Sequence, residues 1–268
     1  MKEVNKTNFD KAVEYYLDEA SKANYFFAHT LEDEKKYLKH NSVRYLNALK
    51  KISKIVTQEN NRELQILEIG FSPMSFILKF FLDDAEHLTI LDRDAHFKER
   101  IEKSGMGFIA RDLTNYAEPS NKKYNIIIFN EVFEHIFCDE TVLLESIVGL
   151  LRDKGYLLLS TPNCFSLKNL SFFLMRKRTA PLNKDILKTD GTAHIREYSM
   201  AEMLELFSSI KNSVVLDHRY ERYFDNVSSL LVFRRNKFAA FFLIAPYVVV
   251  PAIIPSLRIG MSFILKKE

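Results

Sequence analysis

Two carboxylates and an imidazole lie close together in the segment FNEVFEHI, residues 129–136. They are Glu131, Glu134 and His135, and a second imidazole, His194, follows in a later polar loop. Such a set can hold a hard divalent cation that positions a substrate hydroxyl. Without a metal, either histidine can act as a general base, because imidazole titrates near neutral pH. A third interpretation is that Glu134 and His135 begin a helix and only orient their neighbours. The residues alone leave all three open.

Polar residues also end the short apolar runs in the middle of the chain. The runs cover 64–69, 87–91, 107–110, 124–129 and 156–160. The residues at their ends are Glu68 with Gly70, Asp92, Asp112, Asn130, and Thr161 with Asn163. Ligands of open parallel sheets bind beyond the carboxyl ends of the strands. Asp92 therefore suits a bidentate hydrogen bond to ribose hydroxyls, although Asp is also a common turn residue.

The elements that must position these residues alternate between strands and helices. Each apolar run precedes a longer helical stretch, which predicts βαβ units and a largely parallel sheet covered on both faces. Ser72 and Pro73 are an N-cap and first-turn signal for a helix that carries Phe76 and Phe81. Asp139 or Thr141 can cap the next clear helix, which should end before a turn at 153–155.

The two ends of the chain complete this pattern. Residues 8–57 are expected to be helical, and 41–56 have apolar residues at every third position with lysines opposite, which predicts a one-sided packing helix. A helix over 199–210 and strands near 213–220 and 258–267 are expected after the middle region.

The order of six motifs resembles the class I S-adenosylmethionine-dependent methyltransferases. The motifs are EIG (68–70), LDRD (91–94), ARDL (110–113), FNEVFEHI (129–136), LLRDKGYLLLSTPN (150–163) and HIREYS (194–199). The chain is most similar to the branch that contains ubiquinone-biosynthesis O-methyltransferases and sugar- and lipid-modifying enzymes of bacterial surface-polysaccharide pathways. The resemblance implies an α/β fold with a Rossmann-like, seven-stranded, mostly parallel sheet. Its last strand would be antiparallel, with helices on both faces and an N-terminal helical extension.

The resemblance also implies a cofactor, S-adenosyl-L-methionine, and a role for each strand end. Glu68, Gly70 and Asn130 would border the methionine part of the cofactor. Asp92 would bind the ribose hydroxyls, and Asp112 would lie beside the adenine amino group. A similar cluster with a later histidine holds magnesium in small-RNA 2′-O-methyltransferases. This implies Mg²⁺ as a second cofactor at Glu131, Glu134, His135 and His194.

The loop after the first strand departs from the family pattern. The family usually has E-x-G-x-G-x-G, whereas this chain keeps only Gly70 and has Ser72 and Met74 at the later glycine positions. Ser72 still offers a hydroxyl, and the helix beginning at Pro73 still presents free N–H groups to a carboxylate. Cofactor binding is therefore expected to survive. The alternative is a degenerate methyltransferase fold that binds a ligand without catalysis. A nicotinamide-dependent dehydrogenase is disfavoured because no GxGxxG is present.

Composition restricts the partners and the compartment. The net charge is +3 over 268 residues and no long Lys/Arg tract occurs, which argues against nucleic acid as a partner. Cys138 and Cys164 lie outside any CxxC spacing, and the N-terminus is too polar for a secretory signal. A cytoplasmic protein is expected, and peripheral binding to the inner face of the membrane is left open. The oligomeric state is left open.

Residues 238–257 form a run of twenty uncharged residues with three prolines. The run is long enough to span a bilayer, but its prolines would interrupt a helix. A membrane span, a membrane-surface element and a wall of the substrate pocket all remain open. A second apolar segment, 165–178, is either a lid over the acceptor or a helix that buries Phe172 and Phe173 against the sheet.

These segments give the expected organisation and acceptor. Helices in 1–60 should pack on a methyltransferase core of 61–237, with an apolar insert at 238–257 and a closing strand at 258–268. Transfer of the methyl group to an oxygen of a small or lipid-linked acceptor is expected, with a nitrogen as the alternative. The apolar segments favour a membrane-associated acceptor, such as a lipid-linked saccharide or a prenylated aromatic ring.

Overall fold

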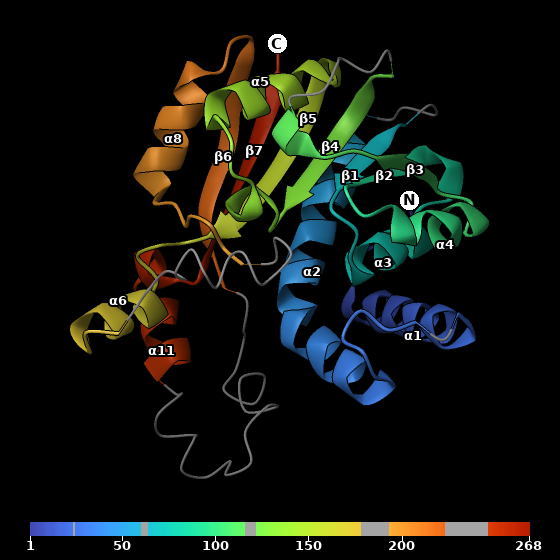
Figure 1. Cartoon of the computed structure of the whole chain (residues 1–268), viewed down its shortest axis with the longest axis horizontal. Helices are drawn as coiled ribbons and strands as arrows, with labels where there is room; N and C mark the ends of the chain where they lie inside the picture. The colour runs from blue at the N-terminus through green and yellow to red at the C-terminus, as the bar shows by residue number, and fades with distance from the viewer. Residues whose placement is uncertain (24, 60–63, 116–121, 178–192, 223–245) are drawn as a thin grey trace.

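The computed structural model, which describes residues 1–23, 25–59, 64–115, 122–177, 193–222 and 246–268, contains a seven-stranded sheet (Figure 1). The strand order is β3-β2-β1-β4-β5-β7-β6. The strands are β1 (Ile66–Ile69), β2 (Leu88–Asp92), β3 (Gly107–Ala110), β4 (Tyr124–Asn130), β5 (Leu151–Pro162), β6 (Ser213–Glu221) and β7 (Gly260–Lys267). Strands β1 to β5 pair in parallel, and β7 runs antiparallel to β5 and β6. The predicted fold is therefore confirmed.

Helices cover both faces of the sheet. They are α1 (Lys6–Lys22), α2 (Leu31–Glu59), α3 (Pro73–Phe81), α4 (Lys98–Lys103), α5 (Glu140–Gly149), α6 (Leu167–Leu174), α8 (Met200–Ser209) and α11 (Pro246–Ile253). Successive strand residues belong to different cores: Ile66 packs with α1, α2 and α3, whereas Leu67 packs with α5 and α8. Because side chains alternate along a strand, a sheet covered twice needs continuous apolar strands, as this sequence has.

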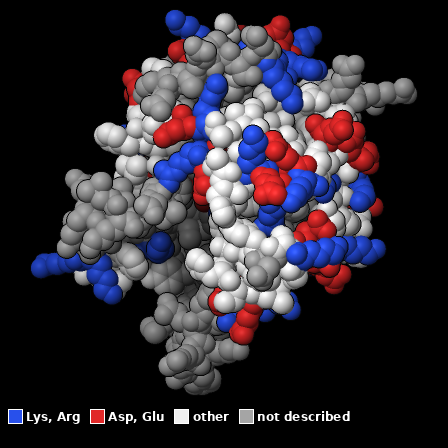
Figure 2. Space-filling model, turned by 45° about the vertical axis from the view of Figure 1, so that its right-hand side comes forward, with Lys and Arg blue, Asp and Glu red and all other residues white. Residues whose placement is uncertain are grey.

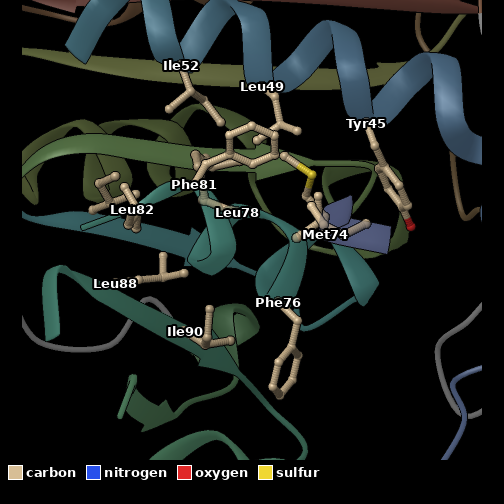
Figure 3. Close-up of a cluster of buried hydrophobic side chains, with 14 of the residues drawn as sticks. Tyr45, Leu49, Ile52, Met74, Phe76, Leu78, Phe81, Leu82, Leu88 and Ile90 are labelled. Atoms are coloured by element: carbon tan, nitrogen blue, oxygen red, sulfur yellow. The ribbon is translucent and has the colours of Figure 1, made fainter. Parts of the chain in front are cut away.

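The N-terminal helices are part of this core. Leu49 and Ile52 of α2 point toward Met74 and Phe81 of α3 (Figure 3), and all four side chains are buried. The prediction of a packing helix is thus confirmed for the apolar side of α2. On the face seen in Figure 2, Lys and Arg are interspersed with Asp and Glu, unlike the single-sign surface of a dedicated nucleic-acid binder.

One predicted turn is wrong. Residues 153–155 were expected to connect a helix to a strand, but they lie within β5, which begins at Leu151. Lys154 has φ +63°, and the pairing of β4 with β5 shifts register between Tyr124 and Ile126. An irregularity in a strand therefore takes the place of the expected turn.

The apolar C-terminal segment is only partly described. Residues 238–245 lie outside the described part of the chain, and the rest forms α11 and a 3₁₀ turn, η5 (Pro255–Leu257). Among the helices that the structure describes, none combines the length and the apolar character needed to cross a bilayer. In α6, Phe173 is 71% exposed, so of the two alternatives for this segment, the one that buries Phe173 against the sheet is wrong.

Candidate functional site

A cavity of about 550 Å³ lies at the edge of the sheet where the parallel strands end. Residues at the carboxyl ends of β1 to β6, or directly after them, line it together with residues near the start of the antiparallel β7 and one side of α2. The lining includes every site residue predicted from the sequence, namely Glu68, Gly70, Ser72, Asp92, Asp112, Asn130, Glu131, Glu134, His135 and His194. The topology therefore brings together residues that span more than a hundred positions of the chain.

The strand order divides this cavity into two halves. The ends of β3, β2 and β1 contribute Asp112, Asp92 and Gly70 to one half. The last residues of β5 and β6 contribute Ser160 and Glu221 to the other half, and the start of the antiparallel β7 contributes Ser262. Asn130 and the residues after it, at the end of the central strand β4, lie between the two.

Gly70 is required by two features of the first loop. Its φ of +87° lies in the left-handed region that favours glycine, and its N–H donates to the Leu91 carbonyl at 2.8 Å. A Cβ at this position would lie 2.5 Å from Val132 Cγ2, far inside van der Waals contact. The backbone can therefore run close to β4 only without a side chain here.

The two residues that replace the later glycines have structural roles. The Ser72 hydroxyl accepts from the Met74 N–H at 3.2 Å, and the Ser75 hydroxyl accepts from the Ser72 N–H, which together form a capping box. Met74 is 2% exposed and points into the core beside Tyr45 and Leu49 (Figure 3). The N-terminus of α3 consequently keeps its place beside the cavity.

Glu68 is a buried carboxyl group in the wall of the first half of the cavity, the half that contains Gly70, Asp92 and Asp112. Its Oε2 has no hydrogen-bond partner within the described residues. Burial raises the pKa of Glu68 from its ordinary value to about 8, and a hydrogen bond with Ser75 lowers it only partly. Such a group is suited to bind a cationic group of a ligand, because an ammonium group would replace the interactions with water that the carboxyl group loses on burial.

Replacing Glu68 with glutamine should raise the free energy of unfolding by an amount that depends on pH. The pKa of Glu68 is higher in the folded state, so its favourable contribution is complete below about pH 4.5 and is lost as pH rises to about 8. Glutamine does not titrate, so the advantage of the variant should grow over this window, by up to about 4 kcal/mol. Urea unfolding of both proteins at pH 5, 6, 7 and 8 measures the difference. A pH-independent difference would contradict the burial of an uncharged carboxyl.

Asp92 and Asp112 are already held by backbone groups. Asp92 accepts from the N–H of Phe71 at 2.7 Å on one oxygen and from that of Asp94 at 2.8 Å on the other. Asp112 accepts from the N–H and the hydroxyl of Thr114, and these bonds lower the pKa of Asp112. Both carboxylates are therefore fixed at strand ends with acceptor capacity left for a ligand.

Glu134, His135 and His194 form a cluster in the middle of the cavity. Glu134 Oε1 lies 3.9 Å from His135 Nε2 and 4.0 Å from His194 Nε2, and the two rings meet edge to face with centroids 4.8 Å apart. Burial raises the pKa of Glu134, as does the charge of Glu131, whereas burial lowers the pKa of His135. The neutral forms of Glu134 and His135 are thus favoured.

Hydrogen bonds fix the orientation of both imidazoles. His135 Nδ1 lies 3.0 Å from the Ala193 carbonyl, so it carries the proton and donates. His194 Nδ1 lies 2.9 Å from Glu197 Oε1, and Glu197 in turn accepts from the Asn169 amide. Both Nε2 atoms are therefore left as acceptors that face Glu134. Glu197 and Asn169 were not recognised in the sequence, although Glu197 lies within the HIREYS motif.

Glu131 does not belong to the cluster, contrary to the predicted set of four metal ligands. Its φ is +56°, and its carboxylate accepts from the Ser160 hydroxyl at 2.9 Å and pairs with Arg44 of α2 at 3.4 Å. The atoms of Glu134, His135 and His194 lie within 4.8 Å of one another. Two imidazoles and one carboxylate are typical of transition-metal ions rather than of Mg²⁺, which prefers oxygen ligands. The residues that converge therefore fit Mg²⁺ poorly.

The second half of the cavity has a polar wall whose residues are not among those predicted from the sequence. Lys51 of α2 donates to Glu221 and to the Ser262 hydroxyl, both at 2.5 Å, and Asn47 donates to Glu221 at 3.3 Å. Arg44, Asn47 and Lys51 have the i, i+3, i+7 spacing of one helix face. That spacing is the signal that could have identified a functional side on the predicted packing helix.

Asn163, in the STPN motif, ties together three segments beside the cavity. Its amide donates to the carbonyls of Ser256 and Arg258, both at 2.8 Å, and accepts from the Phe165 N–H at 3.0 Å. Its own carbonyl accepts from Asn169 of α6 at 3.4 Å. The side chain is 1% exposed. This single residue therefore fixes α6 and the segment after α11 at the end of β5.

Comparison with known proteins agrees with this geometry. A family model described as a methyltransferase domain matches residues 37–217. The chain is similar in fold to the plantazolicin methyltransferase BamL, solved with a triazolic desmethylPZN analog and SAH, at 16% identity and a TM-score of 0.53 over 99% of each chain.

Two other solved structures are similar as well. The plantazolicin methyltransferase BpumL, solved with a pentazolic desmethylPZN analog and SAH, has 14% identity and a TM-score of 0.52 over 98% of this chain and 100% of its own. An S-adenosylmethionine-dependent methyltransferase from Mesorhizobium loti has 11% identity and a TM-score of 0.50 over 76% of this chain and 91% of its own. At these identities the likeness concerns the fold. The comparison with curated proteins gave no match.

Proposed function

This chain belongs to the methyltransferase-domain family, whose model covers residues 37–217, and from that premise we propose that it transfers the methyl group of S-adenosyl-L-methionine to a hydroxyl of a small or lipid-linked saccharide. The observation that carries the proposal is the cavity, which joins the predicted cofactor residues to a separate polar wall. The placement in the ubiquinone-biosynthesis O-methyltransferase-like branch rests on the EVFEHI and STPN motifs and stays a prediction.

The residues of the first half fit the cofactor. The absence of a side chain at Gly70 lets the cofactor approach the backbone closely. Asp92 is held by hydrogen bonds in a position to accept from two ribose hydroxyls. Glu68 offers a buried, unpaired oxygen where the amino group of the methionine part is expected. Asn130 faces the same part, and Ser72 with the N-terminus of α3 faces its carboxylate. Asp112 lies at the end of β3, where the adenine is expected. Bound S-adenosyl-L-methionine supplies an electrophilic methyl group on a sulfonium.

The second half favours a hydroxylated acceptor over a prenylated aromatic one. Its wall consists of charge pairs that balance each other, Arg44 with Glu131 and Lys51 with Glu221, beside two serine hydroxyls. A sugar can donate to the carboxylates and accept from the cations, whereas an isoprenoid chain would remove water from these charge pairs and offer no hydrogen bond in its place. Phe27 and Tyr37, whose ring centroids are 5.3 Å apart, form an aromatic surface elsewhere in the lining of the same cavity.

His135 is placed to act as general base. Its Nδ1–H is fixed by the Ala193 carbonyl, so Nε2 can accept the proton of the acceptor hydroxyl. The new bond joins the acceptor oxygen to the methyl carbon as the bond from that carbon to sulfur breaks, and the electron pair leaves with the sulfur. His194 and Glu134 would hold the protonated imidazole and the acceptor in line, and much of the rate would come from alignment.

Calorimetric titration with S-adenosylhomocysteine tests the proposal. We expect saturable binding with one site per chain, and we expect Asp92→Asn to weaken it at least about tenfold because a bidentate charge-assisted hydrogen bond is lost. Asp94→Asn is the matched control, because Asp94 caps the same loop but does not line the cavity. Absence of binding at millimolar ligand would favour the alternative, a degenerate methyltransferase fold that binds a partner without catalysis.

A further inference from the structure

Two short helices outside the cavity share an exposed apolar surface. Helices α6 and α11 contact each other and project together beyond the sheet (Figure 1). The α6/α11 patch comprises their exposed apolar side chains and those of adjoining residues, namely Phe165, Leu170, Phe173, Leu174, Met175, Val249, Ile253 and Ile254. Phe173, Leu174 and Ile253 are 71%, 73% and 75% exposed. Soluble monomers rarely leave so many large apolar side chains together in water, so the patch requires a partner.

The described segments that form the patch carry charges of a single sign. Residues 164–177 and 246–260 contain no Asp or Glu, whereas Lys168, Arg176 and Lys177 are exposed beside the apolar side chains. On the face that Figure 2 shows, Lys and Arg are otherwise mixed with Asp and Glu. Large apolar side chains flanked by Lys and Arg on short helices are typical of segments that lie in the interface of an anionic membrane.

The charge also argues against a second copy of the chain as the partner. A two-fold symmetric dimer through this patch would place the same three cations of each copy against one another. A bilayer with anionic headgroups instead offers the opposite charge around an apolar interior. We therefore propose that the α6/α11 patch docks this protein on the surface of an anionic lipid bilayer, without crossing it.

The patch is fixed relative to the cavity. Asn163 binds the α6 side through Phe165 and Asn169 and the α11 side through Ser256 and Arg258. Arg258 holds α11 to the sheet by donating to the carbonyls of Pro251 and Tyr220, both at 3.0 Å. Asn169 also donates to Glu197, the partner of His194. Docking would consequently hold the cavity at a set position next to the membrane.

Vesicle flotation with the purified full chain tests this proposal. Vesicles of phosphatidylcholine with about 30% phosphatidylglycerol should bind the protein, and pure phosphatidylcholine vesicles should bind it at least about fivefold less. The double variant Phe173→Glu/Ile253→Glu should bind anionic vesicles at least about tenfold more weakly, because two apolar anchors are lost and negative charge is added.

Leu216→Glu is the matched control, because Leu216 is 54% exposed on β6, away from the patch, and its variant should float like the parent chain. The double variant changes only exposed side chains, and an unaltered unfolding midpoint and S-adenosylhomocysteine affinity would verify that it is folded. Equal flotation of the double variant and the parent would overturn the proposal. So would an absence of vesicle binding accompanied by dimerisation of the parent alone in sedimentation velocity, which would assign the patch to a second copy. Both readouts are independent of the methyl acceptor.

Discussion

Replacing His135 with alanine should lower kcat by about 10²–10⁴, the usual contribution of general base catalysis, while the affinity for S-adenosylhomocysteine changes by less than about threefold. The reason is the position of Nε2, which faces the centre of the cavity as an acceptor while Nδ1 is held by Ala193. Methyl transfer to a saccharide hydroxyl, followed with labelled S-adenosyl-L-methionine, gives the rate, and calorimetry gives the affinity.

The matched control for this variant is His218→Ala, which removes an exposed imidazole on β6 that does not line the cavity. It should retain the full rate. The same assay after dialysis against a chelator separates a base from a metal ligand. Unchanged activity with no bound metal by elemental analysis would agree with the base, whereas activity restored by a divalent ion would contradict it and assign Glu134, His135 and His194 to a metal.

Gly70→Ala should weaken S-adenosylhomocysteine binding by about ten- to a hundredfold and lower the unfolding midpoint. A side chain at φ +87° costs about 1–2 kcal/mol, and the added Cβ would lie 2.5 Å from Val132 Cγ2. The loop must therefore move away from β4, and it would take the N-terminus of α3 and the Asp92 contact with Phe71 out of place. Calorimetry and thermal unfolding measure the two effects.

The double variant Gly70→Ala/Val132→Ala separates the two causes. Removal of the valine methyl groups relieves the close contact but not the strained φ, so binding should recover in part and remain below that of Val132→Ala alone. If Gly70→Ala binds the ligand as well as the parent chain does, the close approach of this backbone plays no part in cofactor binding.

The sheet and the strand ends could be predicted because they depend on local patterns. Short apolar runs predict the strands, and the polar residues at their ends predict Asp92, Asp112 and Asn130 as site residues, all of which line the cavity. Ser72 with Pro73 likewise predicted the start of α3, where the structure has a capping box.

The polar wall could not be predicted in the same way. Lys51 and Glu221 are 170 positions apart, and only the placement of α2 across the ends of β6 and β7 brings them together. The pairing of Glu131 with Arg44, rather than with the nearby histidines, could not be predicted from a local pattern either. It depends on the positive φ of Glu131 and on the placement of α2. Likewise the exposure of Phe173 depends on where α6 packs, which an apolar run alone does not determine.

Helix α2 packs on the core with one side and lines the cavity with the other, so substitutions on the two sides should have different effects. Leu49 and Ile52 pack the helix against α3, whereas Arg44 and Lys51 line the half of the cavity that is proposed to hold the acceptor. Exchange of the polar side alone would change which molecule is methylated and leave the donor half untouched. Removal of the helix would instead expose the core beneath it. New acceptor preferences in descendants of this chain are therefore expected to arise by point substitution on α2 rather than by its loss.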